Sequence, residues 1–99
     1  MPAANTDLHE GGVLCLSHLK KGDAASVVGM VDGGGAEKVA MQRRLLELGF
    51  VAGETIRIVA ESFPTRDPIA VRIGNSTFAL RRHEASLVRV VPMPRTAAV

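Results

Sequence analysis

The stretch Met41–Gly53 most strongly constrains the fold of this chain, because its apolar spacing is helical and its glycines mark where the helix ends. Met41, Leu45 and Leu48 recur at i, i+4 and i+7 and therefore lie on one helical face. Gly49 can adopt the left-handed conformation that closes a helix without a Cβ clash. The sequence thus predicts a helix that follows the glycine-rich break at 32–35 and ends at Gly49.

The residues after this helix predict a second change of direction. Phe50 would pack on Leu45, the apolar pair that a Schellman motif brings together. Gly53 can take the positive φ of a type II turn. Beyond Gly53 the apolar residues alternate, and alternation is typical of a half-buried β-strand.

Strands are predicted both before and after the helix. Ile56, Ile58 and Ala60 should share one face, and Gly74 should open a two-residue hairpin turn. Phe78 should point inward from the returning strand. The predicted strands are 24–31, 54–61, 69–73, 76–81 and 88–90, and 82–85 reads as one helical turn.

About five short strands with one α-helix inserted after the first strand predict a mainly β fold, a small and partly open barrel. A chain of 99 residues is long enough for one modest core. We assign residues 13–91 to the barrel domain and expect flexible tails at 1–12 and 92–99, which are small, polar or proline-containing.

Composition argues against nucleic acid as the partner. The chain has three Phe, no Trp and no Tyr, which leaves few aromatic faces for base stacking, and its net charge is only +2. Arg57, Arg72 and Arg81 occupy outward strand positions and could form a stripe. We interpret them as solvated cross-strand residues, with a protein contact as the alternative and an RNA-binding small barrel as the least favoured one.

Four residues could contribute to a metal site, although their spacing is that of no standard site. His9, Cys15 and His18 offer nitrogen and sulfur ligands, and His83 lies far along the chain. Neither a C-x-x-C pair nor an H-E-x-x-H motif is present. We therefore expect that no metal is required, that any Fe²⁺ or Zn²⁺ binding is weak, and that Cys15 and His18 form no catalytic arrangement, so that the chain is not an enzyme.

The chain should reside in the cytoplasm. A single cysteine excludes an internal disulfide and fits a reducing compartment. The first twelve residues lack the basic and apolar regions of a signal peptide, and no apolar run approaches the length that spans a bilayer. We therefore expect no direct membrane insertion.

Apolar residues that a small core does not need predict a docking surface. Val39 and Leu46 lie off the Leu45 face of the helix, and Phe63 lies in a loop with two prolines. A protein partner could cover them, whereas in the alternative the helix packs on the N-terminal segment. The predicted partner-binding residues are Val39, Arg43, Leu46, Phe63 and Arg66, and the predicted structural residues are Gly49, Phe50, Gly53 and Gly74.

Three segments resemble one known family. They read L-S-H-L-K-K-G-D-A-A, then R-R-L-L-E-L-G-F-V-A-G-E-T-I-R-I, then D-P-I-A-V-R-I-G-N-S-T-F-A-L-R-R-H-E-A. In this order they are similar to the bacterial ferrous-iron transport protein A (FeoA) family, and the resemblance extends over about three-quarters of the chain, residues 16–91. It implies an SH3-like β-barrel with a helix after the first strand.

The resemblance also implies a function and a partner. FeoA-like proteins are accessory components of ferrous iron uptake, and the implied partner is FeoB, a membrane permease with a GTP-hydrolysing domain that they meet on the cytoplasmic side. An alternative is a GTPase-modulating role with an arginine from Arg43, Arg44 or Arg66. Another is a metal-responsive regulatory module, because the domain recurs at the C-terminal end of iron-dependent repressors. A homo-oligomer is compatible with this pattern.

Overall fold

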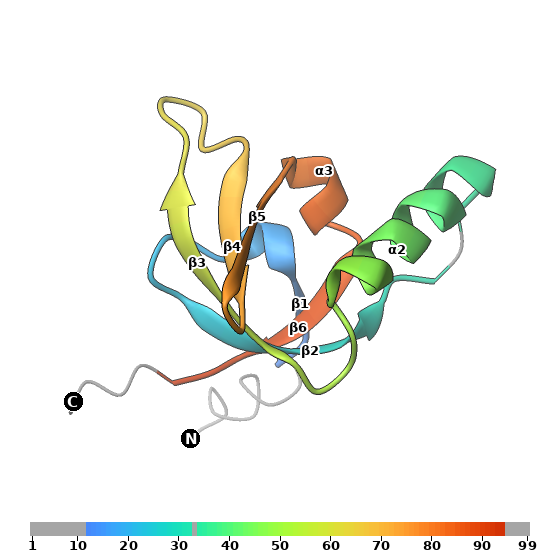
Figure 1. The fold of residues 1–99 in the computed structure, drawn as a ribbon, viewed down its shortest axis with the longest axis horizontal. Coiled ribbons are helices and arrows are strands. Elements are labelled where there is room, and N and C mark those ends of the chain that lie inside the picture. Colours follow the sequence, from blue (N-terminus) through green and yellow to red (C-terminus); the bar gives the residue numbers. More distant parts are fainter. Residues whose placement is uncertain (1–11, 33, 95–99) are drawn as a thin grey trace, which may run out of the picture.

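The computed structural model describes residues 12–32 and 34–94 of the chain. Figure 1 shows a strongly curved antiparallel sheet that forms a partly open barrel, with one long helix projecting beside it. The strands are β1 (Leu14–Cys15), β2 (Ala24–Met30), β3 (Thr55–Glu61), β4 (Ile69–Ile73), β5 (Ser76–Leu80) and β6 (Val88–Pro92). The helices are the 3₁₀ turn η1 (Leu16–His18), α2 (Ala36–Leu48) and the short α3 (Arg82–Ala85).

The predicted mainly β barrel is confirmed, with one strand more than the predicted five. The sheet order is β1-β6-β2-β3-β4-β5. The additional strand is β1, which has two residues and pairs Leu14 with Val90 of β6. Because β1 precedes β2, the long helix follows the second strand of the sheet and not the first.

The predicted end of the helix is confirmed in detail. Gly49 has a φ of 119°, in the left-handed region. The Gly49 N–H donates to the Leu46 carbonyl at 3.0 Å, and the Phe50 N–H donates to the Leu45 carbonyl at 3.1 Å. This pair of bonds is the Schellman motif. Leu45 and Phe50, its apolar pair, are both buried, so the motif also fixes α2 to the core.

Two turns place the strands that follow. Gly53 has a φ of 96°, and the Glu54 N–H donates to the Val51 carbonyl at 3.1 Å, as in a type II turn. Gly74 has a φ of 59°, while Ile73 pairs with Ser76. A positive φ at the first central residue alone makes this a type II′ hairpin.

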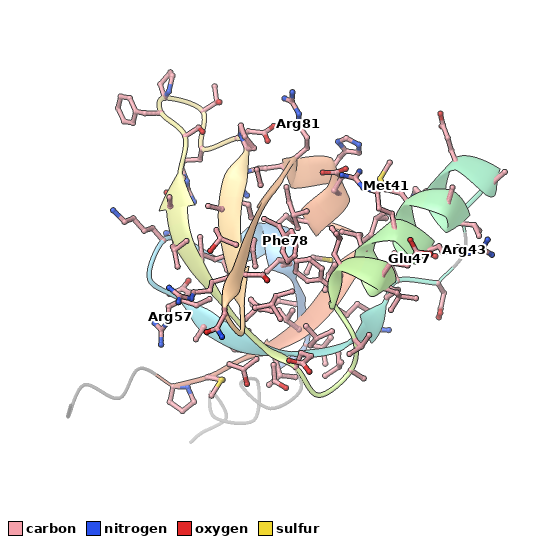
Figure 2. All side chains as sticks on the ribbon, viewed as in Figure 1. Met41, Arg43, Glu47, Arg57, Phe78 and Arg81 are labelled. Carbon is pink, nitrogen blue, oxygen red and sulfur yellow. The ribbon has the colours of Figure 1, made fainter. Side chains whose placement is uncertain are left out.

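The core fills the barrel with aliphatic side chains and two phenylalanines. Phe50 is fully buried, and its ring centroid lies 6.2 Å from that of Phe78, which points toward the barrel interior in Figure 2. The other large, fully buried side chains are Leu16, Leu45, Ile56, Ile58, Ile69, Leu80, Val27, Val71, Val88 and Val90. No polar or charged residue is buried among the described residues.

One predicted strand face is wrong at its end. Ile56 and Ile58 are buried as predicted, but Ala60 is exposed. The register between β3 and β4 shifts between Ile58 and Ala60, which indicates a β-bulge. A bulge inserts one extra residue and thereby reverses the alternation that follows it.

The C-terminal boundary lies slightly later than predicted. β6 continues to Pro92, which pairs with Ala25, and the Met93 N–H donates to the Ala24 carbonyl at 2.9 Å. Most of the two predicted tails, residues 1–11 and 95–99, lies outside the described residues. Within the part that is described, no helix has the length and apolar content to cross a membrane.

Candidate functional site

Helix α2 is attached to the barrel mainly through its C-terminal half. Of its 13 residues only Leu45 is buried, and residues 36–40 are all exposed. Figure 1 shows the N-terminal end of α2 projecting away from the sheet. Val39 and Leu46 are seven residues apart and therefore share one flank, on which they are 47% and 43% exposed. This apolar flank is the first candidate surface.

The opposite flank of α2 faces α3 across a cleft of about 410 Å³. Its lining is mixed, with apolar Met41 and Leu87 beside polar and charged groups. The lining residues are Glu37, Lys38, Met41, His83, Ser86 and Leu87. Both sides of the N-terminal half of α2 are thus accessible, which is unusual for a helix whose role is only to cover a core.

The polar contacts of α2 hold it on the barrel but leave one arginine unpaired. Gln42 Nε2 donates to the Val31 carbonyl at 2.9 Å, and Arg44 forms an ion pair with Glu84 of α3 at 3.2 Å. Arg43 is exposed, points away from the barrel in Figure 2, and has no ion pair within the described part of the chain. Arg43 therefore belongs to the candidate surface, whereas Arg44 is engaged within the domain.

The structure separates the predicted docking residues into two groups. Phe63 and Arg66 lie in the loop between β3 and β4, and Figure 1 places this loop at the opposite end of the molecule from α2. We expected α2 and this loop to contribute to one surface, and that expectation is wrong. The physical reason is the chain order: α2 leads into the start of β3, whereas the loop follows the end of β3, so the two lie at opposite ends of that strand.

Arg66 stabilises its own loop. It has a φ of 64°, and its side chain lies 3.5 Å from the Glu61 carboxylate. Its carbonyl accepts a hydrogen bond from Arg82 Nε at 3.1 Å, and Arg82 Nη1 also donates to the Ser17 carbonyl. Arg82 thereby links η1, the loop and α3, a role that the sequence analysis did not assign to it.

The stripe that Arg57, Arg72 and Arg81 could have formed is not continuous. Arg57 of β3 and Arg72 of β4 lie directly opposite each other in the register. Each donates to a carbonyl instead of a carboxylate: Arg57 Nη1 to Gly22 at 3.0 Å and Arg72 Nε to Gly74 at 3.2 Å. Arg81 follows the end of β5, and Figure 2 shows it far from Arg57. The three residues do not form a continuous row.

The candidate metal ligands do not converge where the structure describes them. Cys15 is half-buried in β1, His18 is exposed in η1 and His83 is exposed in α3. His9 lies outside the described residues. Across residues 12–32 and 34–94 there is no group of three or more His, Cys, Asp or Glu side chains that could hold a metal ion.

We predict that the folded domain needs no metal. A closed structural site requires about four nitrogen or sulfur ligands. Dialysis of the purified protein against a chelator should therefore leave both its circular dichroism spectrum and its melting temperature unchanged. A large fall in the melting temperature that added Zn²⁺ or Fe²⁺ reverses would contradict this prediction.

Comparison with known proteins identifies the family. A sequence model of the FeoA domain matches residues 14–92. The chain belongs to the FeoA family. This family is associated with ferrous iron transport, as an accessory domain and not as a known enzyme.

Three similar proteins support this assignment. The chain is 41% identical over 75 residues to a fusion of Fe²⁺ transport protein A with the Fe²⁺ transporter FeoB from Porphyromonas gingivalis; the match covers 76% of this chain and 8% of that protein. FeoA of Stenotrophomonas maltophilia, described as an SH3 domain protein complexed with zinc, is 37% identical, with a TM-score of 0.71 over 84% of this chain and 99% of that one. A FeoA-like protein of Clostridium acetobutylicum is 25% identical, with a TM-score of 0.72 over 85% and 91% of the two chains.

These findings confirm the SH3-like barrel that the resemblance implied. A manganese-dependent transcriptional repressor shares the fold, with a TM-score of 0.69 over 82% of this chain and 37% of that one, at 22% identity. The fold thus occurs in a separate chain, in a fusion with a transporter and within a repressor. The surfaces of this chain, and not its fold, must therefore specify its partner.

Proposed function

We propose that this chain is an adaptor of ferrous iron uptake that binds a FeoB-type, GTP-hydrolysing permease on its cytoplasmic side. The observation that carries this proposal is the half-exposed apolar flank of α2, formed by Val39 and Leu46. The fusion of both proteins in one chain of Porphyromonas gingivalis supports their association. Linked domains meet at a high effective concentration, so a fusion favours partners that bind each other.

The α2 flank has the chemistry of a helix that docks in an apolar groove. Anchors at i and i+7 are two of the positions that such helices use. Arg43 lies on the helix between Val39 and Leu46 and is free to pair with an acidic residue at the rim of the groove. Because the N-terminal half of α2 projects from the barrel, a partner can reach this flank without any rearrangement of the core.

Leu46→Glu should weaken binding of the permease at least about tenfold, which corresponds to 1.4 kcal/mol. A carboxylate placed in a desolvated apolar contact loses its hydration without gaining a partner. The fold should change by no more than about 0.5 kcal/mol, because Leu46 is 43% exposed. The measurement is a titration of the detergent-solubilised permease after native melting has been verified.

Arg57→Glu is the matched control, because it places the same carboxylate on the exposed barrel face. It should bind almost as well as the unmodified protein. If Leu46→Glu unfolds the domain, Leu46 is a core residue and the proposed surface does not exist. If Leu46→Glu binds normally while Arg57→Glu fails, the Arg57–Arg72 face is the contact surface instead.

A GTPase-modulating role is the second candidate, and the environment of Arg43 favours it. Arg44 and Arg66 are held in ion pairs, whereas Arg43 is exposed on the candidate surface. An arginine supplied to a bound nucleotide stabilises the charge of the transition state. Measuring GTP hydrolysis in the same titration separates the two roles. An adaptor forms a complex with the permease without changing the rate at which the permease hydrolyses GTP, whereas a modulator changes that rate.

A further inference from the structure

The proposed function leaves one prominent apolar residue unexplained. Phe63 is 92% exposed, the highest value among the large apolar side chains of the described residues. It lies in the β3–β4 loop, at the end of the barrel away from α2 (Figure 1). A partner seated on the α2 flank would therefore not cover it.

The loop that carries Phe63 is fixed at its base. The Ser62 N–H donates to the Pro68 carbonyl at 3.1 Å, which closes the loop. The Asp67 carboxylate accepts the Arg82 N–H at 2.9 Å, so α3 holds the second limb of the loop. A side chain presented by a fixed loop loses less conformational entropy on binding than one on a mobile loop.

Unpaired cations flank both limbs of this loop. The Lys21 N–H donates to the Glu61 carboxylate at 3.0 Å, which places Lys21 beside the first limb. Leu80 pairs with Ile69, so Arg81 follows beside the second limb, and Figure 2 shows Arg81 on the same upper side of the molecule as this loop. Lys20, Lys21 and Arg81 are exposed and form no ion pair with any described residue.

The nearby carboxylates do not neutralise these cations directly. Glu61 forms an ion pair with Arg66, and Asp67 accepts the Arg82 N–H. Asp23 accepts the Lys20 N–H at 2.8 Å. Among the described residues no carboxylate forms an ion pair with Lys20, Lys21 or Arg81, so these three side chains can still contact an external anion.

We propose that this end of the barrel, which we define as Phe63 with Lys20, Lys21 and Arg81, rests on an anionic lipid surface. Phe63 would enter the headgroup region, and the three cations would contact lipid phosphates. An apolar anchor and a basic rim are the two signals that together hold a protein at a membrane interface. The inference rests on the proposed function in one respect, since a permease partner brings the domain close to a bilayer.

The shape of this surface favours lipid over a second protein. The loop that carries Phe63 projects from the barrel (Figure 1), so a protein would have to offer a concave pocket that matches it, whereas lipid headgroups rearrange around an inserted side chain. The basic rim also complements the negative surface potential of the cytoplasmic leaflet. With lipid contacting the loop and the permease contacting α2, the two separated surfaces would together fix the orientation of the domain.

Co-sedimentation with vesicles tests this proposal. The full chain should bind vesicles of phosphatidylglycerol and phosphatidylethanolamine, and it should not bind vesicles of phosphatidylcholine. Binding should fall as salt rises, because screening weakens the attraction between the cations and the headgroups. Phe63→Ser should reduce the partition coefficient about tenfold, because the favourable transfer of the Phe side chain from water into the headgroup region is lost.

Leu46→Ser is the matched control, because it removes an exposed apolar side chain from the other surface. It should bind these vesicles like the unmodified protein. Lys21→Glu should also weaken binding to the anionic vesicles. The proposal is wrong if the unmodified chain does not bind anionic vesicles, or if Phe63→Ser binds them equally well.

The two proposals can fail separately. Loss of permease binding in detergent by Leu46→Glu tests the α2 surface alone, since no bilayer is present. If Phe63→Ser weakens the complex in detergent while the unmodified chain ignores vesicles, Phe63 occupies a protein pocket and the lipid proposal is overturned. A chain that binds vesicles through Phe63 but never binds the permease would retain this inference and overturn the proposed function.

Discussion

Phe50→Ala should lower the free energy of unfolding by about 3–5 kcal/mol, the range found when a buried aromatic residue is truncated. Phe50 is fully buried, follows the Schellman motif and contacts Phe78 in the barrel core. Its removal would leave a cavity where α2 meets the sheet. Because small domains are stable by about 5–15 kcal/mol, this single change should remove a large part of the total. Urea denaturation followed by circular dichroism gives the measurement.

The chain provides a matched control for this prediction. Phe63→Ala removes the same atoms from a side chain that is 92% exposed, so it should change stability by no more than about 0.5 kcal/mol. Should Phe50→Ala fail to fold, Phe50→Leu creates a smaller cavity and should still be destabilised relative to Phe63→Leu. Equal unfolding midpoints for the two positions would show that Phe50 does not hold α2 on the core.

Local features of the fold were predictable because each depends on neighbouring residues. Gly49, Gly53 and Gly74 all have a positive φ, which glycine adopts with the least strain of any residue. The strand β1 was missed because two residues carry no periodic signal and pair with β6 more than 70 positions later. The bulge before Ala60 was missed for a similar reason, since it depends on the register against β4.

The exposure of the candidate surface residues was predictable from the sequence, but their arrangement in space was not predicted. The exposure of Val39 and Leu46 follows from helical spacing relative to Leu45, and the structure confirms it. The separation of Phe63 from α2 follows from the chain order, because α2 leads into the start of β3 and the Phe63 loop follows its end. Arg82 was missed because nothing in the adjacent pair of arginines distinguishes a half-buried side chain from a solvated one.

The cleft between α2 and α3 depends on contacts between residues that lie far apart in the sequence. Met41 and Leu87 meet there from segments that lie more than 40 positions apart, and neither stands in a recognisable motif. A helical wheel of α2 puts Met41 on the core side, where a covered residue is expected. It is only half-buried because α3 is too short to cover the N-terminal half of α2.

Gly49→Val should destabilise the domain by at least about 1–2 kcal/mol, because a β-branched residue resists a φ of 119°. Space is not the cause, since a Cβ at Gly49 would lie 3.7 Å from Ile73 Cδ1, an ordinary contact. The melting temperature should fall by at least about 4 °C in a domain of this size.

Gly49→Asn separates backbone strain from crowding, because Asn is close to Val in size but tolerates the left-handed region. The order of stability should therefore be Gly49, then Gly49→Asn, then Gly49→Val. If the Asn and Val variants melt together, crowding against Ile73 sets the cost and the left-handed cap does not. If neither variant changes the melting temperature, α2 does not need a residue with a positive φ to end at Gly49. The Leu45–Phe50 pair would then be sufficient to hold the helix on the barrel.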